Sequence, residues 1–530
     1  MYDPDIQVAR VEVPARVQEY FYERIRTGKD SLDQILSEVL YLERNRIKEE
    51  KLNKRVKSDI QFLRRLNKIL NRGSEEEKKE IFEELVNRYL VEITGHFSKP
   101  VYKFATIVLP RAIGLMLNPL SIKKLIEDFP NLPSVENNIH ISGEIDLLKS
   151  LYRKGTIILT PTHQSNLDSP IIGLAIYMMG FDPFLYGAGL NLFENPVFSF
   201  FMHNLGAYTV DRKKKNEVYH KTLREYAIFA LERGYNMLFF PGGTRSRSGA
   251  VEKRLKKGLL GTGIKAYINN LLLKREKPDI FVVPLNMSYQ LVLEAETLID
   301  DYLKESGKSR YIIEDDESSK IEKMALFIAK LFSLDAQIYL RVGKAIDVFG
   351  NFVDDEGISY DQRGRRVNRV DYLTENGEIV LDDQRDRVYT DELGETILKE
   401  FKRNNIVLTN HLVSFVAFEI FRKYHRDIDL YKLVKIGVTY KGIPLRDLAR
   451  SVDKLKSELV KMHENDQIFL SPEVLNYNAL DIINDALRYG SIYHKNAFLY
   501  RVGDKIYSDD LAVLFYYHNR LDGYGLEQKV

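Results

Sequence analysis

The chain has 530 residues, enough for two or three domains, and its 78 Lys and Arg residues nearly balance its 76 Asp and Glu residues. This balance points to no particular partner, and we expect none among nucleic acids. The absence of Cys excludes disulfides, thiol nucleophiles and cysteine-ligated metals. The first residues lack the basic-then-apolar pattern of a secretory signal. The best candidate for a membrane span, 104–122, contains Pro110 and Arg111, so we expect an interfacial or buried helix there instead.

The N-terminal region, residues 1–120, is predicted to be helical. Between residues 17 and 90, Glu, Lys, Arg, Leu and Ile recur at helical spacing. Gly73 and Ser74 precede three consecutive Glu residues, which is typical of one helix ending and another beginning with acids in its first turn. We therefore expect a helical hairpin that packs on the main domain and carries no chemistry.

Residues 121–350 alternate between helical and strand patterns, which predicts an α/β domain. The apolar runs that indicate strands lie at 156–160, 184–186, 207–210, 236–240, 280–284 and 337–342, and the helical patterns lie at 144–153, 169–179, 217–232 and 256–273. Several of these strands end in polar or glycine-rich segments, which makes their ends the first places to search for a site.

The remainder of the chain divides into two further regions. Residues 351–390 are polar and charged, and their Asn376-Gly377 pair lies between strand-like runs, which predicts a hairpin turn in a linker. Residues 391–530 are predicted to be mainly helical, with a second hairpin at Gly503-Asp504.

A possible catalytic pair follows the strand at 156–160. His163 leaves the end of this strand, and Asp168 lies five residues later. A carboxylate at this distance can hold Nδ1–H of the imidazole so that Nε2 faces a substrate hydroxyl, as a general base requires. The same spacing also occurs at an ordinary helix start, with Asp168 or Ser165 as the N-cap. The spacing alone favours that ordinary alternative.

The second candidate site is the segment 238–249, where a strand ends in a glycine-rich turn. Arg245 and Arg247 alternate there with Thr244 and Ser246. Guanidinium forks, hydroxyls and backbone N–H groups together can grip a phosphate. A solvated turn is the alternative, but the position at a strand end favours a phosphate site.

Charge around this segment is uneven. Residues 211–257 contain 13 Lys and Arg against 5 Asp and Glu, so this stretch is either a solvated helix face or a surface that attracts phosphate or an anionic membrane. Gly258 to Gly263 lacks the Lys-Ser/Thr of a nucleotide-binding loop, and no metal-spaced cluster is present in the sequence. A base and a phosphate grip, each at a strand end, therefore indicate metal-free group transfer to a hydroxyl of a phosphate-bearing acceptor.

These segments resemble, in order and spacing, the four blocks of the glycerolipid acyltransferase superfamily. His163 and Asp168 match His-x4-Asp, residues 206–212 loosely match Gly-Ala-Phe-Phe-Ile-Arg-Arg, residues 240–247 match Phe-Pro-Glu-Gly-Thr-Arg-Ser-Arg, and residues 282–285, with Pro284, match the Val-Pro strand. Four further segments are similar to bacterial glycerol-3-phosphate and dihydroxyacetone-phosphate acyltransferases: 187–192, 286–290, 337–344 and 514–521. Two positions depart from the pattern, because Gly242 replaces the Glu of block three and Asp211 replaces the first Arg of block two.

The resemblance implies a central mixed sheet flanked by helices and an enzyme without cofactor or metal. It implies transfer of a fatty acyl group from acyl-CoA or acyl-carrier protein to the sn-1 hydroxyl of glycerol 3-phosphate, the first step of phospholipid synthesis. His163 would be the base and Asp168 its orienting partner. The residues expected to hold the phosphate are Arg212, Thr244, Arg245, Ser246, Arg247 and Lys256. We expect backbone N–H groups of Gly242 and Gly243 to stabilise the oxyanion.

Two alternatives remain open: a 1-acylglycerol-3-phosphate acyltransferase, and a non-catalytic lipid-binding relative, which Gly242 and Asp211 suggest. An acyl chain needs an apolar trough, for which 171–181, 193–201 and 102–122 are candidates. With the basic stretch, these segments predict peripheral or monotopic binding to a membrane lipid surface, on the cytoplasmic face of the inner (cell) membrane.

Overall fold

The computed structural model describes residues 1, 3–50, 52–103, 138–189, 204–306, 336–436, 441–490 and 494–530. The candidate apolar segment 193–201 and nearly all of 102–122 lie outside these residues. Among the helices of the described ranges, none is both long enough and apolar enough to cross a bilayer.

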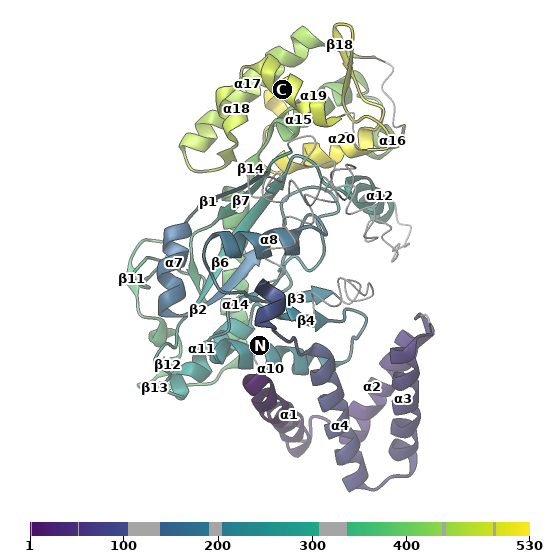
Figure 1. Cartoon of the computed structure of the whole chain (residues 1–530), viewed down its shortest axis with the longest axis vertical. Helices are drawn as coiled ribbons and strands as arrows, with labels where there is room; N and C mark the ends of the chain where they lie inside the picture. Colours follow the sequence, from purple (N-terminus) through teal and green to yellow (C-terminus); the bar gives the residue numbers. More distant parts are fainter. Residues whose placement is uncertain are drawn as a thin grey trace, which may run out of the picture.

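Between residues 3 and 93, the N-terminal region contains the helices α1 (Asp3–Arg26), α2 (Leu32–Lys48), α3 (Lys54–Arg72) and α4 (Glu75–Ile93), where the sequence predicts a hairpin. The predicted helix start at Ser74 is confirmed, because its side chain accepts the N–H of Glu77 while Glu77 accepts the N–H of Ser74. Helices α1 and α4 pack on α10 (Glu217–Glu232) of the central domain (Figure 1). The apolar faces of this region therefore share a core with the sheet domain.

The central domain is a mixed sheet flanked by helices, which confirms the predicted fold class. Its strands are β1 (Ile139–Gly143), β2 (Thr156–Pro161), β3 (Leu185–Gly189), β4 (Ala207–Val210), β5 (Met237–Leu238), β6 (Ile280–Tyr289), β7 (Ile338–Val342), β8 (Ile346–Asp347), β9 (Phe352–Val353), β10 (Ser359–Tyr360) and β11 (Arg366–Val367). Their order is β11-β10-β9-β8-β6-β2-β5-β3-β4, and β7 bridges β6 and β1. Strands β2 to β6 pair in parallel, whereas β7 and β8 run antiparallel to β6.

Helices cover both faces of this sheet: α7 (Ile145–Lys154), α8 (Asp168–Met178), α10 (Glu217–Glu232) and α11 (Thr262–Leu272). Helix α12 (Ala295–Ser306) packs against α20 (Leu511–His518). Along the buried strand β2, Ile157 and Leu159 join the core containing α7 and α8, and Ile158 joins the core containing α10 and α11. Burial on both faces explains why this strand reads as a continuous apolar run.

Several predicted elements have other bounds in the structure, among them the following. The strand at 236–240 is reduced to β5, and the helix at 256–273 begins only at Thr262. The N–H of Lys256 donates instead to the Pro241 carbonyl oxygen (2.7 Å) and closes a loop over residues 241–256. The strand at 280–284 continues to Tyr289, because β6 pairs along its second half with β7.

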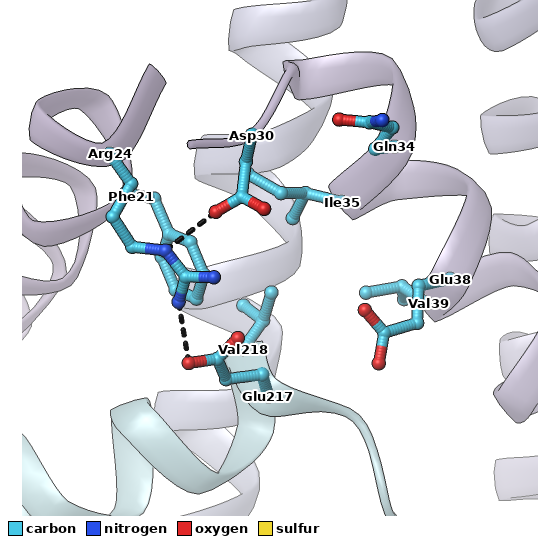
Figure 2. Close-up of a pocket in the computed structure, with 9 residues that line it drawn as sticks. All are labelled: Phe21, Arg24, Asp30, Gln34, Ile35, Glu38, Val39, Glu217 and Val218. Atoms are coloured by element: carbon cyan, nitrogen blue, oxygen red, sulfur yellow. Dashed lines mark hydrogen bonds and ion pairs between the residues drawn. The ribbon is translucent and has the colours of Figure 1, made fainter. Parts of the chain in front are cut away.

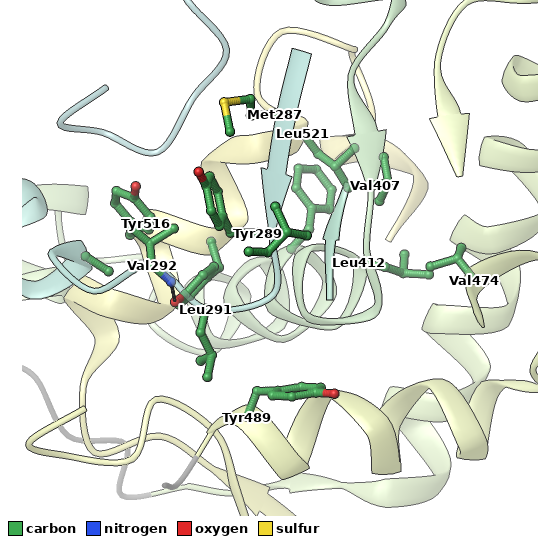
Figure 3. Close-up of a cluster of buried hydrophobic side chains, with 14 of the residues drawn as sticks. Met287, Tyr289, Leu291, Val292, Val407, Leu412, Val474, Tyr489, Tyr516 and Leu521 are labelled. Atoms are coloured by element: carbon green, nitrogen blue, oxygen red, sulfur yellow. Dashed lines mark hydrogen bonds between the residues drawn. The ribbon is translucent and has the colours of Figure 1, made fainter. Parts of the chain in front are cut away.

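The C-terminal region contains α14 (Asp383–Arg403), α15 (Thr409–Tyr424), α16 (Leu430–Ile436), α17 (Leu445–Glu464), α18 (Pro472–Asn476), α19 (Ala479–Gly490) and α20 (Leu511–His518). Both predicted hairpin turns are confirmed: Asn376-Gly377 joins β12 (Thr374–Glu375) to β13 (Glu378–Ile379), and Gly503-Asp504 joins β17 (Tyr500–Val502) to β18 (Lys505–Tyr507). Figure 3 shows Tyr289 at the end of β6 within a cluster that also contains Tyr516 and Leu521 of the C-terminal region. The last helix is therefore part of the core beside the strand ends.

Candidate active site

His163 and Asp168 meet directly beyond the end of β2. Nδ1 of His163 lies 2.7 Å from Oδ2 of Asp168. The N-cap of α8 is Leu167, without a side-chain capping bond, so the alternative in which Asp168 or Ser165 caps the helix is wrong. The same Asp168 oxygen accepts the N–H groups of Gln164 (2.6 Å) and Ser165 (3.1 Å). The carboxylate is thus fixed by the short turn that joins the two residues.

Tyr289 holds the other oxygen of this carboxylate. Its hydroxyl donates to Oδ1 of Asp168 at 2.6 Å, from the C-terminal end of β6. The Asp168 side chain is fully buried and accepts four hydrogen bonds, so it is well suited to orient the imidazole. Sequence reasoning missed Tyr289, because its contact depends on the register of β6 against β2.

Burial and neighbouring cations keep the His163 imidazole neutral. The ring stacks on Phe240 with 4.0 Å between centroids. Burial lowers the pKa of His163, the hydrogen bond to Asp168 opposes this, and the charges of Arg245 and Arg212 lower it further. Because the tautomer with Nδ1–H bonded to Asp168 leaves Nε2 as the acceptor, this imidazole can act as a general base.

The loop 241–256 contacts the main chain of His163 on both sides. The N–H of Ser246 donates to the His163 carbonyl oxygen (2.7 Å), and the N–H of His163 donates to Oε1 of Glu252 (2.6 Å). Burial raises the pKa of Glu252 to about 7. Sequence reasoning missed Glu252, which lies outside the matched block, and only the acidic residue that block three lacks could have prompted a search for it.

The predicted phosphate-binding cations fall into two groups. Arg212 and Arg245 are close enough to His163 to lower its pKa. Burial lowers the pKa of Arg212, and the charge of Arg245 lowers it further. Arg247 instead pairs with Glu305 of α12. Lys256 lies beside the glycine turn, because a Cβ on Gly243 would meet its Cδ at 2.6 Å. Among the described residues, Arg212 and Lys256 form no ion pair.

Arg245 also has a role within the protein. Its Nη1 lies 3.1 Å from Oε1 of Glu294, a buried carboxylate that also accepts from Ser165 Oγ (2.9 Å) and the N–H of Asn166 (2.7 Å). This network joins the loop 241–256 to the turn between His163 and Asp168. The guanidinium is thereby held beside the catalytic pair.

The remaining predicted residues have structural contacts. Thr244 is exposed, whereas the Ser246 hydroxyl donates to the Ala250 carbonyl oxygen (2.6 Å) within the loop. Gly243 has φ of +76° and donates its N–H to the Phe240 carbonyl oxygen (3.0 Å), so of the two predicted oxyanion donors this one is engaged in a turn. Pro284 lies inside β6 in register with Thr160, and its carbonyl oxygen accepts the N–H of Gly343 (2.8 Å).

The second departure from the family pattern, Asp211, connects the N-terminal region to the site. It is buried and accepts a bond from Arg55 of α3 at 2.7 Å. Nearby Lys214 is also buried and pairs with Glu92 of α4 at 2.6 Å. Lys214 therefore adds nothing to a basic outer surface. The segment that carries Arg212 is fixed from both ends by these N-terminal helices.

The C-terminal tail contacts both the loop 241–256 and strand β6. Nδ2 of Asn519 donates to the Ser248 carbonyl oxygen (2.9 Å), and Nη2 of buried Arg520 donates to the Met287 carbonyl oxygen (2.6 Å) and to Ser288 Oγ (2.9 Å). A Cβ on Gly249 would lie 2.1 Å from the Tyr516 carbonyl oxygen, so only glycine permits this contact.

A small pocket elsewhere does not belong to this site. It lies between α1, α2 and the start of α10, where Arg24 pairs with both Asp30 and Glu217 (Figure 2). Its only guanidinium is thus already neutralised. Within the described ranges, no cluster of three or more His, Asp or Glu side chains could hold a metal ion.

Comparison with known proteins agrees with this geometry. A protein-family profile described as Acyltransferase matches residues 142–288, from the end of β1 to β6, including His163, Asp168 and the loop 241–256. The relatives named glycerol-3-phosphate acyltransferase include those of Pseudomonas aeruginosa PAO1, 24% identical over 242 residues, Haemophilus ducreyi, 32% over 206, and Pasteurella multocida, 33% over 150. These matches cover 46, 38 and 28% of this chain and 26, 23 and 17% of the respective relatives.

Residues 142–288 of the chain thus match the Acyltransferase family, and the relatives of this region are similar to proteins of the glycerolipid acyltransferase superfamily. Within that superfamily the chain resembles the bacterial glycerol-3-phosphate acyltransferases, of whose length it spans about a quarter.

Proposed function

We propose that this chain transfers a fatty acyl group from an acyl thioester, acyl-CoA or acyl-carrier protein, to the sn-1 hydroxyl of glycerol 3-phosphate. The observation that carries the proposal is the His163–Asp168 pair, 2.7 Å apart, beside the cations Arg212 and Arg245. A neutral base next to a cationic patch suits an acceptor that carries both a hydroxyl and a phosphate. The relatives' shared name supports the same acceptor.

In the proposed reaction the catalytic pair moves the proton and the cations hold the acceptor. Nε2 of His163 takes the proton of the acceptor hydroxyl while its oxygen attacks the thioester carbonyl carbon. Asp168 stabilises the imidazolium that forms. The tetrahedral oxyanion then collapses, the carbon–sulfur bond breaks, and the leaving thiolate takes the proton from His163. Arg212, Arg245 and Lys256 hold the phosphate, so that the hydroxyl stays in line with the base.

Turnover by the purified chain tests this proposal. Labelled glycerol 3-phosphate with palmitoyl-CoA or palmitoyl-carrier protein should give labelled lysophosphatidate. The His163→Ala variant should give none, and His220→Ala, which removes an exposed histidine of α10, should match wild type. Unlabelled lysophosphatidate should compete only weakly. Product made equally by the His163→Ala variant would refute the assigned base, and strong competition with diacyl product would favour the 1-acylglycerol-3-phosphate acyltransferase.

Peripheral binding on the cytoplasmic face of the cell membrane is part of the proposal. The acyl product partitions into lipid, and α8 of the described region exposes Tyr177 and Met178 near its C-terminal end. Flotation with vesicles of phosphatidylglycerol and phosphatidylethanolamine should recover the protein at the top of the gradient. Recovery of all protein at the bottom, at low as well as high salt, would refute membrane binding.

A further inference from the structure

The glycine at position 242 leaves a space that another side chain fills. A Cβ placed on Gly242 would lie 3.2 Å from Cγ and 3.7 Å from Oε1 of Glu252. Gly242 is not among the glycines with positive φ, unlike its neighbour Gly243 at +76°. The backbone at 242 therefore accepts an ordinary side chain, and a Cβ there would crowd the Glu252 side chain.

The distances also put the position of the Glu252 carboxylate oxygen within reach of a side chain at 242. A glutamate carboxylate oxygen lies roughly 3 to 3.7 Å from its own Cβ, given the bond lengths involved. The Oε1 atom of Glu252 lies 3.7 Å from the ideal Cβ position on Gly242. A glutamate at position 242 thus has the reach to bring a carboxylate oxygen near the point that Oε1 of Glu252 occupies. The pattern of block three has its acid at position 242, and this chain has one at position 252.

This point is next to the base. There Oε1 of Glu252 accepts the N–H of His163 at 2.6 Å, while the N–H of Ser246 holds the His163 carbonyl oxygen at 2.7 Å. The second oxygen, Oε2, is buried and has no hydrogen-bond partner among the described residues. The charge of buried Arg520 stabilises the ionised carboxylate. Burying a carboxylate with one oxygen unpaired costs free energy of folding, so the position of Glu252 needs an explanation.

We propose that Glu252 is a positioning residue for His163 that replaces, from ten residues downstream, the carboxylate missing at Gly242. The inference rests on the proposed function only in naming His163 as the base. Glu252 fixes the peptide group of His163, so that Nε2 stays aligned with the acceptor while Asp168 fixes the ring. The acidic residue of block three then stands ten positions later in the sequence but at a similar place in the fold.

A relocation experiment tests this directly. The four proteins are wild type, Gly242→Glu, Glu252→Gly and the double variant, with Gly258→Glu as a matched control, since a Cβ there meets nothing within 4 Å. Three readouts are measured: kcat and KM, the melting temperature, and the rate at which diethyl pyrocarbonate modifies His163, followed by mass spectrometry. Glu252→Gln, which keeps an acceptor oxygen but removes the charge, is measured beside Glu252→Gly as the conservative variant.

We expect Glu252→Gly to lower kcat roughly 10- to 100-fold, the effect of losing one hydrogen bond to a charged group, with little change in KM, and to speed modification of His163. Gly242→Glu crowds two carboxylates into one space and should lower the melting temperature. The double variant should recover kcat, melting temperature and the modification rate beyond the product of the single effects. Glu252→Gln should fall between wild type and Glu252→Gly.

A double variant no better than the product of its single variants overturns the replacement. Equal loss of kcat in Glu252→Gln and Glu252→Gly overturns the positioning role. Failure of wild type to use glycerol 3-phosphate, with the modification rate still recovered in the double variant, refutes the proposed acceptor and leaves the relocation standing. The two proposals therefore fail separately.

Discussion

Replacement of Asp168 by Asn separates the charge of this residue from its hydrogen bonds. Oδ2 accepts from His163, Gln164 and Ser165, and Oδ1 accepts from the Tyr289 hydroxyl. An Asn can place its oxygen where Oδ2 is and its amide where Oδ1 is. The Tyr289 hydroxyl can rotate to accept from that amide. Asp168→Asn should therefore keep the local structure and the His163 tautomer while removing the negative charge.

The cost of that change falls on the transition state, where His163 is positively charged. An opposite charge at about 4 Å contributes about 4 kcal/mol at an effective dielectric constant near 20, which corresponds to about a 10³-fold fall in kcat. Asp168→Ala should lose at least as much activity and also leave two backbone N–H groups, the His163 Nδ1–H and the Tyr289 hydroxyl without an acceptor. At about 1 kcal/mol or more for each, its melting temperature should fall by roughly 5 °C.

The assay compares kcat, with saturating labelled glycerol 3-phosphate and palmitoyl-CoA, and the melting temperature for wild type, Asp168→Asn and Asp168→Ala. The exposed Asp146 of α7, changed to Asn, is the matched control and should behave as wild type. Retention of more than a tenth of the wild-type kcat by Asp168→Asn would refute the role of the charge. A melting temperature as low in Asp168→Asn as in Asp168→Ala would refute the count of bonds.

Three further outcomes follow from the site and its supports. Because burial and two arginines lower the pKa of His163, its modification by diethyl pyrocarbonate should be half-maximal below pH 6.5, and Arg212→Ala should move that midpoint upward, since removing a positive charge favours the protonated imidazole; a midpoint above 6.5 would contradict this. Arg212→Ala should also raise KM for glycerol 3-phosphate roughly 10- to 100-fold without changing KM for the thioester; equal changes in both constants would show that the phosphate is held elsewhere. Arg55→Ala leaves Asp211 buried without its partner and should lower the melting temperature, which Arg55→Ala combined with Asp211→Asn should partly restore; no loss in the single variant would show that this pair does not dock the N-terminal helices.

The sequence predicted the local features of the fold well. Strand β4 and helix α10 have the predicted bounds, and both hairpins turn at the predicted pairs. These elements are set by short-range signals: apolar periodicity, the N-cap at Asn216 and the Asn-Gly turn, whose residues adopt φ of +51° and +86°. The His163–Asp168 pair belongs to the same class, because one turn of chain joins its members.

Contacts between distant segments could not be predicted in this way. Glu252 lies 89 positions from His163, and Tyr289 lies 121 positions from Asp168. Nothing in the periodicity near 252 distinguishes it from a solvated acid in a basic stretch, since the closing bond between Lys256 and Pro241 depends on the folded loop. The ion pairs of Arg245 with Glu294 and of Arg247 with Glu305 could not be predicted for the same reason.

The two departures from the family pattern have a common explanation in these distant contacts. Asp211 forms a buried ion pair with Arg55 of the N-terminal helices. The neighbouring Arg212 still lowers the pKa of His163. Gly242 lacks the carboxylate of the family pattern, but the Glu252 side chain lies beside it and accepts the main-chain N–H of His163. Each departure is thus matched by a partner that only the folded chain brings near, and neither disturbs the bonds of Asp168. Gly242 and Asp211 therefore do not by themselves indicate lost turnover, and the assay of wild type beside His163→Ala tests the non-catalytic alternative.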